Sequence, residues 1–392
     1  MLRLFGHSKN YSWGSPDAIP RFIGTEPTDE PLAELWFGAH SSGPTLTDDE
    51  SSLSEHIARD VDGTLGPDVA QRFSHRLPYL VKLLAPASAV SLQVHPNATY
   101  AAAGYAAEQR EQVEAANRTF SDAFHKPEML FAVTPFEGLI GFRDLEAIQA
   151  TLARFTHPAL RPAADLIRRS PADLKEAFGY LSRLGRDDVA GIVQESSRVG
   201  SSHDDSVAGI SALAAQYPGD PGVVASVLLD RVVLAPGDAA FVPSGVVHSY
   251  RSGLAVEVMA NSDNVFRAGL TRKRVSLPQV LDNLLTDPPR VFRAPGDGTA
   301  SYDIDPGTPE FAISHIWVDG DHRTLPAFGP KLVLCLNGEV SLVSRSGEIV
   351  LTRGRAAFIP HADGAVSTQG AGSVIVVRTP AARDLPHEGG SR

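Results

Sequence analysis

The chain has 392 residues, which is too long for one hydrophobic core of ordinary size, so we expect two or three domains. Its composition, with 43% hydrophobic and 21% charged residues, 34 Gly and 29 Pro, indicates a folded protein rich in turns and excludes a disordered one. The net charge of -11 argues against attraction to nucleic acid or to an anionic membrane surface.

Neither a membrane span nor a secreted protein is indicated. No apolar run reaches the roughly 18 residues that a membrane span needs. The single cysteine, Cys335, cannot form an internal disulfide, and the first residues lack the apolar stretch of a signal peptide. We therefore expect a cytoplasmic protein.

Strand and helix patterns occur in blocks along the chain. Residues 1–97 mix short apolar alternations with Gly and Pro, which predicts short strands. Residues 98–120 are rich in Ala, Glu, Gln and Arg, which favour helix. A longer helical pattern covers residues 144–229, and strands return from residue 230 onward.

Two helix starts in the second helical region carry their own signals. One is Ser170 before Pro171, and the other is Asp204 or Asp205 before an apolar run. The tail, residues 379–392, has little to bury, so we expect it to be mobile.

An internal repeat lies in the second strand region. Residues 234–245 read LAPGDAAFVPSG and residues 351–362 read LTRGRAAFIPHA, which predicts two copies of one β module. The first copy, with its Gly and Pro followed by His248, resembles the second sequence motif of the cupin β-barrels, in which the His closes a metal site. The second copy has His361 directly after its Pro, so we expect a barrel without metal.

A polar face on one predicted strand suggests a metal site. In residues 89–97, AVSLQVHPN, the two-residue strand period places Ser91, Gln93 and His95 on the same face. Together with Glu128 and His248, Gln93 and His95 would provide two imidazoles, one carboxylate and one amide oxygen. That set suits a catalytic Zn²⁺ with an open position for water or substrate.

Glu257 has two possible positions. If Ser252 and Gly253 form a two-residue hairpin turn, His248 lies opposite Glu257 and both side chains enter the same cavity. A three-residue turn would place Glu257 on the opposite face as an exposed strand carboxylate. The sequence leaves both open.

Several motifs in the same order along the chain resemble the type I phosphomannose isomerase family over nearly the full length. They are YSWGS (11–15), ELWFGAH (34–40), SLQVHPN (91–97), HKPEM (125–129), YPGDPGVV (217–224) and NVFRAGLT (264–271). The resemblance implies reversible isomerisation of mannose 6-phosphate and fructose 6-phosphate. It also implies a mainly β fold of two cupin barrels with an α-helical insertion.

The resemblance divides the chain into three parts. Residues 1–143 and 230–290 would form the metal-bearing catalytic barrel, and residues 144–229 the helical domain. Residues 291–392 would form the second barrel, without metal. We expect a monomer that binds a sugar phosphate and neither nucleic acid nor membrane.

Roles are carried over from the family only where its motifs match. The resemblance implies one Zn²⁺ per chain, held by Gln93, His95, Glu128 and His248, and a catalytic Arg267. Family members usually read GLTPK where this chain reads GLTRK, so Arg272 replaces a proline. That departure bears on the local loop shape more than on the chemistry.

The reaction requires a proton to move between C2 and C1 through an enediol, so we expect an acid/base near neutral pKa and an electrophile at the oxygens. Glu257 and Lys126 are the candidates for proton transfer, and their order is open. The groups that could hold the phosphate are Ser91, Lys82, Lys126, Arg267 and Lys273.

Two other functions fit parts of this pattern. A cupin oxygenase would hold Fe²⁺ through two histidines and a carboxylate, but Gln93 and the basic residues argue against it. A non-enzymatic sugar-binding cupin would not need the HKPE and RAGLT motifs together. No P-loop or similar stretch indicates an added nucleotide-transferring domain.

Overall fold

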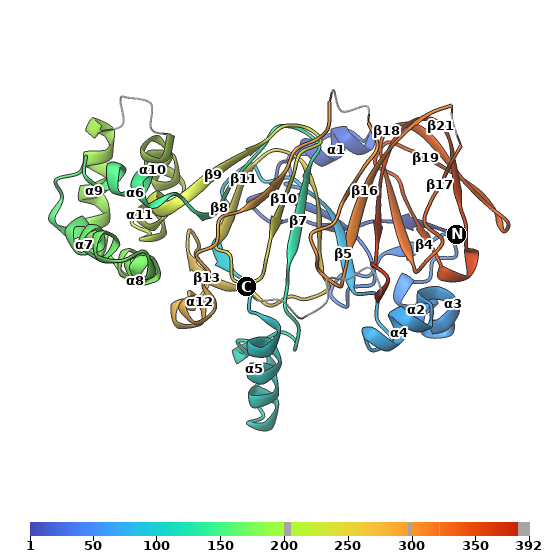
Figure 1. Ribbon diagram of the computed structural model, residues 1–392, viewed down its shortest axis with the longest axis horizontal. Coiled ribbons are helices and arrows are strands. Elements are labelled where there is room, and N and C mark those ends of the chain that lie inside the picture. Colours follow the sequence, from blue (N-terminus) through green and yellow to red (C-terminus); the bar gives the residue numbers. More distant parts are fainter. Residues whose placement is uncertain (200–204, 297–299, 321, 383–392) are drawn as a thin grey trace.

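The computed structural model describes residues 1–199, 205–296, 300–320 and 322–382. Three antiparallel sheets form a row, with a helical group at one end (Figure 1). Asp204 and residues 383–392 of the tail lie outside the described residues. In the described part of the chain, no helix is both long and apolar enough to cross a membrane.

The middle of the molecule is a seven-stranded sheet. In spatial order its strands are β14 (Arg290–Phe292), β10 (Ala239–Val242), β7 (Glu128–Ala132), β12 (Ala255–Ala260), β5 (Tyr79–Leu84), β3 (Glu34–Phe37) and β2 (His7–Lys9). Strands β5, β7 and β12 are buried along their whole length, because each has apolar neighbours on both faces of the sheet.

A five-stranded sheet packs against one face of the seven-stranded sheet. Its strands, in spatial order, are β13 (Phe266–Gly269), β6 (Leu92–Val94), β11 (His248–Ser252), β8 (Phe136–Phe142) and β9 (Leu229–Leu234). Leu130 and Ala240 from the larger sheet and Ile140 and Val232 from the smaller one belong to one buried cluster between them. The candidate site lies between these two sheets.

A nine-stranded sheet forms the other end of the molecule. Its main path is β15 (Tyr302–Ile304), β16 (Ala312–Asp319), β21 (Ser367–Arg378), β18 (Lys331–Ser344), β20 (Ala356–Ile359), β1 (Leu2–Phe5) and β4 (Leu46–Thr47), with β17 (Arg323–Thr324) and β19 (Gly347–Thr352) paired beside it. Strand β1 pairs with β20, although the sequence division placed residues 1–143 in the first barrel. The buried side chain of Leu4 explains this pairing, since it joins the core that the two large sheets share.

The seven-stranded and nine-stranded sheets are joined by a common core. Val81 and Phe131 on one side pack in the same cluster as Leu332 and Ile375 on the other. A separate cluster fills the nine-stranded module, and the buried Cys335 belongs to it. Cys335 therefore serves as a small hydrophobic residue in this core.

The predicted helical region packs on the outer face of the five-stranded sheet (Figure 1). Its elements are α6 (Leu145–Leu152), η2 (Pro158–Leu160), α7 (Arg161–Arg169), η3 (Pro171–Asp173), α8 (Leu174–Leu181), α9 (Arg186–Val199), α10 (Asp205–Gln216), α11 (Gly222–Ala225) and η4 (Ser226–Leu228). Phe178 of α8 shares a core with Leu92 and Phe266 of the sheet. The start signals at Pro171 and Asp205 coincide with η3 and α10.

Other helices lie outside this region. They are α1 (Ala18–Ile23), α2 (Leu53–Arg59), α3 (Val61–Leu65), α4 (Pro67–Arg72), α5 (Ala98–Arg110), η1 (Ala115–Asn117), α12 (Leu277–Asn283) and η5 (His361–Asp363). The expectation of strands alone in residues 1–97 was wrong for residues 53–72. Ser52 and Glu55 form a capping box that starts α2, and Pro67 opens α4, so the signal was present. Helix and strand therefore make comparable contributions to a fold expected to be mainly β.

Candidate metal centre and active site

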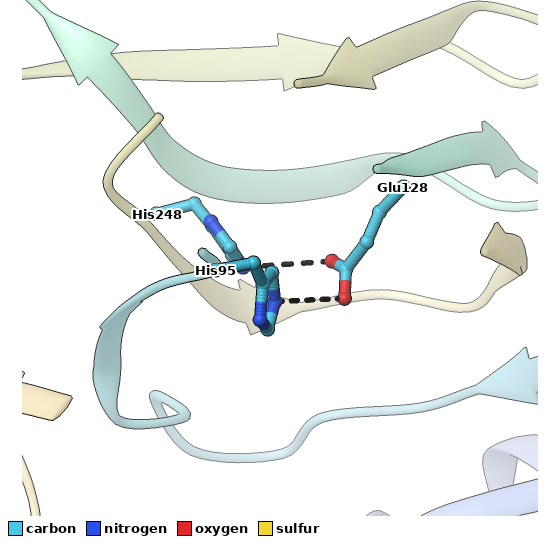
Figure 2. Close-up of side chains that lie close together, drawn as sticks. All are labelled: His95, Glu128 and His248. Atoms are coloured by element: carbon cyan, nitrogen blue, oxygen red, sulfur yellow. Dashed lines mark ion pairs between the residues drawn. The ribbon is translucent and has the colours of Figure 1, made fainter. Parts of the chain in front are cut away.

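Three predicted ligands from the two facing sheets meet in the interior. His95 follows β6 and His248 begins β11 in the five-stranded sheet, whereas Glu128 begins β7 in the seven-stranded sheet. His95 Nε2 lies 3.0 Å from Glu128 Oε1, and His248 Nε2 lies 3.5 Å from Glu128 Oε2 (Figure 2). All three side chains are at most 1% exposed. Strand pairing and sheet packing therefore bring together residues that are far apart in the chain.

Backbone carbonyls orient both imidazoles. His95 Nδ1 lies 2.6 Å from the carbonyl oxygen of Asn264, and His248 Nδ1 lies 3.0 Å from that of Val246. A carbonyl can only accept, so each Nδ1 carries a proton and donates it. In the neutral tautomer each Nε2 then presents its lone pair to the cluster, as in histidines that bind metals.

The atoms of this cluster fit a divalent metal ion. His95 Nε2 and Glu128 Oε1 are buried and 3.0 Å apart, and neither makes a hydrogen bond, although the ammonium group of Lys126 lies 2.9 Å from the carboxylate oxygen. A lone pair that faces a carboxylate oxygen in the interior is unfavourable unless a cation lies between them. Burial, together with the charge of Lys126, lowers the pKa of His95 to about 4, and burial lowers the pKa of His248 as well, so both are neutral and able to bind.

Gln93 lies beside the three residues. It pairs with His248 across β6 and β11, and its Nε2 is 3.2 Å from His248 Nε2. Its Oε1 accepts from Ser91 Oγ at 3.3 Å. In this arrangement the amide nitrogen faces the histidine, whereas a metal ligand would present the oxygen. A 180° rotation of the amide exchanges the two atoms, and the Ser91 hydroxyl can serve either of them.

Glu128 is surrounded by groups that keep it ionised. Lys126 Nζ lies 2.9 Å from its Oε1, and the Tyr250 hydroxyl donates to its Oε2 at 2.6 Å. Burial alone would raise the pKa of Glu128, but the charge of Lys126 holds that pKa well below its usual range. The site therefore contains a charged carboxylate in a nearly solvent-free position.

Glu257 lies in the interior, although it does not pair with His248 across a hairpin. Strand β11 pairs with β6 and β8, whereas β12 pairs with β5 and β7. Ser252 and Gly253 therefore connect two different sheets, so His248 and Glu257 are not cross-strand neighbours and the hairpin was wrong. Glu257 instead pairs with Lys82 across β12 and β5, and their charged atoms are 2.6 Å apart.

Burial and neighbouring charges together set the protonation of Glu257 and Lys82. Burial raises the pKa of Glu257 to about 6, although Lys82 opposes the shift. Burial would lower the pKa of Lys82, but Glu257 and Glu34 outweigh it and raise that pKa, so Lys82 stays a cation. Glu34 is itself fixed by Trp36, whose Nε1 donates to its Oε2 at 2.7 Å. A carboxylate that titrates near pH 6 is suited to proton transfer.

Arg267 and Lys273 provide positive charge near the cluster. Arg267 on β13 pairs with Gln93 on β6, and Lys273 Nζ lies 5.6 Å from the ring centroid of Tyr11. Burial lowers the pKa of both groups, and Arg267 further lowers the pKa of Lys273. Within the described part of the chain neither forms an ion pair with a carboxylate, so both can receive an anion. Arg272, the departure from the family pattern, is exposed.

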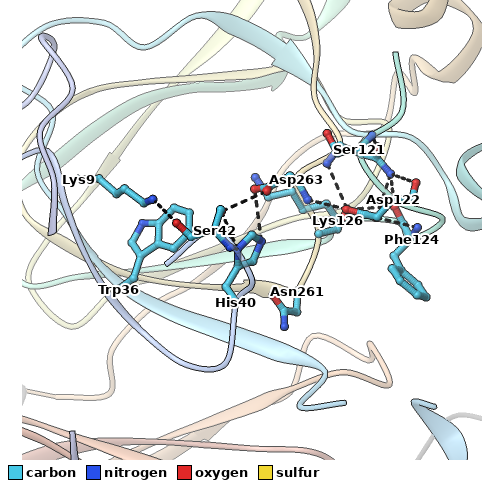
Figure 3. Close-up of polar contacts among 12 residues, drawn as sticks. Lys9, Trp36, His40, Ser42, Ser121, Asp122, Phe124, Lys126, Asn261 and Asp263 are labelled. Carbon is cyan, nitrogen blue, oxygen red and sulfur yellow. Dashed lines mark hydrogen bonds and ion pairs between the residues drawn. The ribbon is translucent and has the colours of Figure 1, made fainter. Parts of the chain in front are cut away.

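Sequence reasoning missed several residues that surround the site. Buried His40 lies 3.4 Å from Asp263 and 2.9 Å from the Ser42 hydroxyl (Figure 3). Burial lowers the pKa of His40, and the positive charges of Lys82 and Lys126 lower it as well. Tyr250 is the second omission, although the two-residue strand period places it on the same face as His248. His40 is part of the ELWFGAH motif, from which no role had been inferred.

Comparison with known proteins agrees with this geometry. Residues 1–145 match the family model described as phosphomannose isomerase type I, catalytic domain. The chain belongs to the type I phosphomannose isomerase family. It is 33% identical to the mannose-6-phosphate isomerase of Escherichia coli, over 96% of this chain and 99% of that protein. It is 31% identical to the human mannose-6-phosphate isomerase, over 90% and 91% of the two chains.

Solved structures of the family have the same fold. The apo form of mannose 6-phosphate isomerase from Salmonella typhimurium superposes with a TM-score of 0.85 at 31% identity, covering 97% of this chain and 99% of that one. A zinc-bound mannose 6-phosphate isomerase superposes with a TM-score of 0.85 at 30% identity, covering 96% and 99%.

Replacing His248 should remove metal from the protein. We expect His248→Ala to lose most of its bound metal after dialysis, because one imidazole ligand disappears. The matched control is His361→Ala, which removes the histidine near the corresponding place in the second repeat and should keep the wild-type content. Elemental analysis of folded protein measures both, and full metal content in His248→Ala would contradict the assignment.

Proposed function

We propose that this chain interconverts mannose 6-phosphate and fructose 6-phosphate with the help of a divalent metal ion of the zinc type. The observation that carries the proposal is the buried cluster of His95, Glu128 and His248 between two facing sheets, in which His95 Nε2 and Glu128 Oε1 face each other without a hydrogen bond. Gln93 is the fourth proposed ligand. The identity to curated mannose-6-phosphate isomerases along nearly the whole chain supports the choice of reaction.

We also propose the architecture that the sequence suggested. The seven-stranded and five-stranded sheets would form the metal-bearing cupin barrel, and the nine-stranded sheet would form the second barrel. The helices of residues 144–229 would be the insertion between strands of the first barrel. The monomeric state and the cytoplasmic location stay predictions from the sequence.

The proposed reaction proceeds through a cis-enediol. When bound, the metal would supply a Lewis acid for the substrate oxygens. Glu257 is the first candidate to move the proton between C2 and C1, because its pKa of about 6 leaves it mostly ionised at neutral pH. Lys82, 2.6 Å away, keeps the carboxylate in place. Lys126 is the second candidate, and its amine already contacts Glu128.

The phosphate would be held mainly by Arg267 and Lys273. Both lack a carboxylate partner in the described structure, and a guanidinium can bind phosphate through two parallel hydrogen bonds. Ser91 can add a hydroxyl from the neighbouring strand. Lys82 is a weaker phosphate candidate, because it is buried and already lies near both Glu257 and Glu34.

The direct test is a coupled assay of mannose 6-phosphate conversion. We expect the purified chain to produce fructose 6-phosphate, to lose this activity after chelator treatment and to regain it when Zn²⁺ is added. Circular dichroism before and after treatment checks that the fold persists. Folded, metal-loaded protein that forms no fructose 6-phosphate would refute the proposed function.

Glu257 should control the acid side of the pH profile. As pH falls through about 6, the carboxylate gains a proton and can no longer accept one, so kcat/KM should fall. Glu257→Gln should lower kcat by roughly a hundredfold or more and abolish this dependence, with unchanged metal content. The control is Glu34→Gln, which alters the other carboxylate near Lys82 and should retain the acid limb. An unaltered acid limb in Glu257→Gln would transfer the role to Lys126.

Arg267 should not tolerate even a conservative replacement. Arg267→Lys should lower turnover by about a hundredfold, equivalent to about 2.7 kcal/mol, because an ammonium cannot reproduce the planar fork. A rise confined to KM would indicate phosphate anchoring, and a fall in kcat would indicate stabilisation of developing charge. The control is the exposed neighbour Arg272, because Arg272→Lys should have wild-type kinetics. Wild-type kinetics in Arg267→Ala would exclude Arg267 from the site.

A further inference from the structure

The segment just before the proposed ligand Glu128 is tied to the nine-stranded module by a short contact between His125 and Glu310. His125 Nε2 lies 2.6 Å from Glu310 Oε1. Glu310 precedes β16 and is only 7% exposed. His125 immediately precedes Lys126, so a residue of the second module contacts the chain next to the active site.

Glu310 is itself held in place from two sides. Its Oε2 accepts a hydrogen bond from the Thr308 hydroxyl, so both carboxylate oxygens have partners. The adjacent Pro309 carbonyl accepts from Arg72 at 3.2 Å, which fixes the backbone next to Glu310 against α4. A buried carboxylate with both oxygens engaged has little freedom to move, and it can therefore serve as a fixed point for His125.

The other contacts of the 121–126 segment lead back to the catalytic sheets. Asp122 accepts from the Asp263 amide at 2.9 Å (Figure 3). It also accepts from the Ser262 hydroxyl at 2.8 Å. The Ser121 amide donates to the Asn264 side chain, and the Lys126 amide donates to the Ser244 hydroxyl. The segment is thus anchored to the first module at both ends, and His125 provides the bond to the second.

We propose that Glu310 is a positioning residue of the active site, which acts through His125 to set the place of Lys126 and Glu128. This inference rests on the proposed function in one respect, since it takes Lys126 and Glu128 as working parts of the site. Lys126 Nζ is 2.9 Å from Glu128 Oε1, so a small shift of the backbone at residue 125 changes that contact. Displacements of about 1 Å can cost roughly a hundredfold in rate.

The proposal gives the second module a catalytic role. In the described part of the chain, the one cluster of His, Cys, Asp and Glu side chains that could hold a metal ion is the one at His95. The nine-stranded module would contribute instead by holding a segment of the metal-bearing module. It would act on the site through the side chains of Glu310 and His125, and it would not provide a metal ligand.

The test compares Glu310 variants with a control at the same seam. Glu310→Ala should lower kcat roughly tenfold, with KM and metal content close to wild type, because the segment becomes less well placed. Glu310→Gln keeps an oxygen that can accept from His125 and should lose less. The control is Tyr302→Phe, which removes the hydrogen bond from the Tyr302 hydroxyl to the Gly237 carbonyl, another contact between the two modules, without touching Glu310 or residues 121–128, and should retain wild-type kcat.

A double-mutant cycle and hydrogen exchange complete the test. If Glu310 acts through His125, adding Glu310→Ala to His125→Ala should cause no further loss. Amide exchange in residues 121–126 should be faster in Glu310→Ala than in wild type and unchanged in Tyr302→Phe. Equal losses in Tyr302→Phe and Glu310→Ala would overturn the inference, because they would indicate general weakening of the contact between the two modules.

Different experimental results would contradict this inference and the proposed function. Wild-type kcat and wild-type exchange in Glu310→Ala would overturn the inference and leave the isomerase proposal standing. A wild-type protein without isomerase activity would refute the proposed function, whereas faster exchange in Glu310→Ala would still show that Glu310 holds the segment.

Discussion

The structure depends on a carboxylate that is kept ionised between two packed sheets. Removing the charge of Glu128 from water costs several kcal/mol unless other groups compensate. Lys126 and the Tyr250 hydroxyl compensate that charge, and two neutral imidazoles lie beside it. These groups come from strands or loops of both sheets. The strands that place these partners must therefore keep their register, because a slip of one residue would turn each side chain to the other face.

Hydrophobic packing keeps that register. The five-stranded sheet is buried on both faces, against the helices on one side and the seven-stranded sheet on the other. The seven-stranded sheet is likewise enclosed between the five-stranded and nine-stranded sheets. Several polar side chains in this interior meet a partner there. Glu257 pairs with Lys82 on the neighbouring strand, and Glu34 accepts a hydrogen bond from Trp36 on its own strand.

The candidate site could be predicted from sequence where a local period or a short motif identified its residues. Strand alternation placed Gln93 and His95 on one face, and the motifs added Glu128 and His248. Predictions failed where the connection between strands mattered. The Ser252–Gly253 turn looks like a hairpin locally, but its strands enter different sheets, and only long-range packing decides that. The capping box at Ser52 was a local signal that was overlooked.

The pairing of β1 with β20 has a consequence for how the chain assembles. Leu2 lies opposite Phe358, so the first strand of the protein completes a sheet whose other strands come from the last part of the chain, apart from the short β4. During synthesis, β1 must wait without its partner until nearly the whole polypeptide has been made. Contacts between segments so distant in sequence slow folding, because closing the loop costs entropy before the contact is gained. The strands of the seven-stranded and five-stranded sheets therefore emerge from the ribosome before β20, and β1 can pair with β20 only after them.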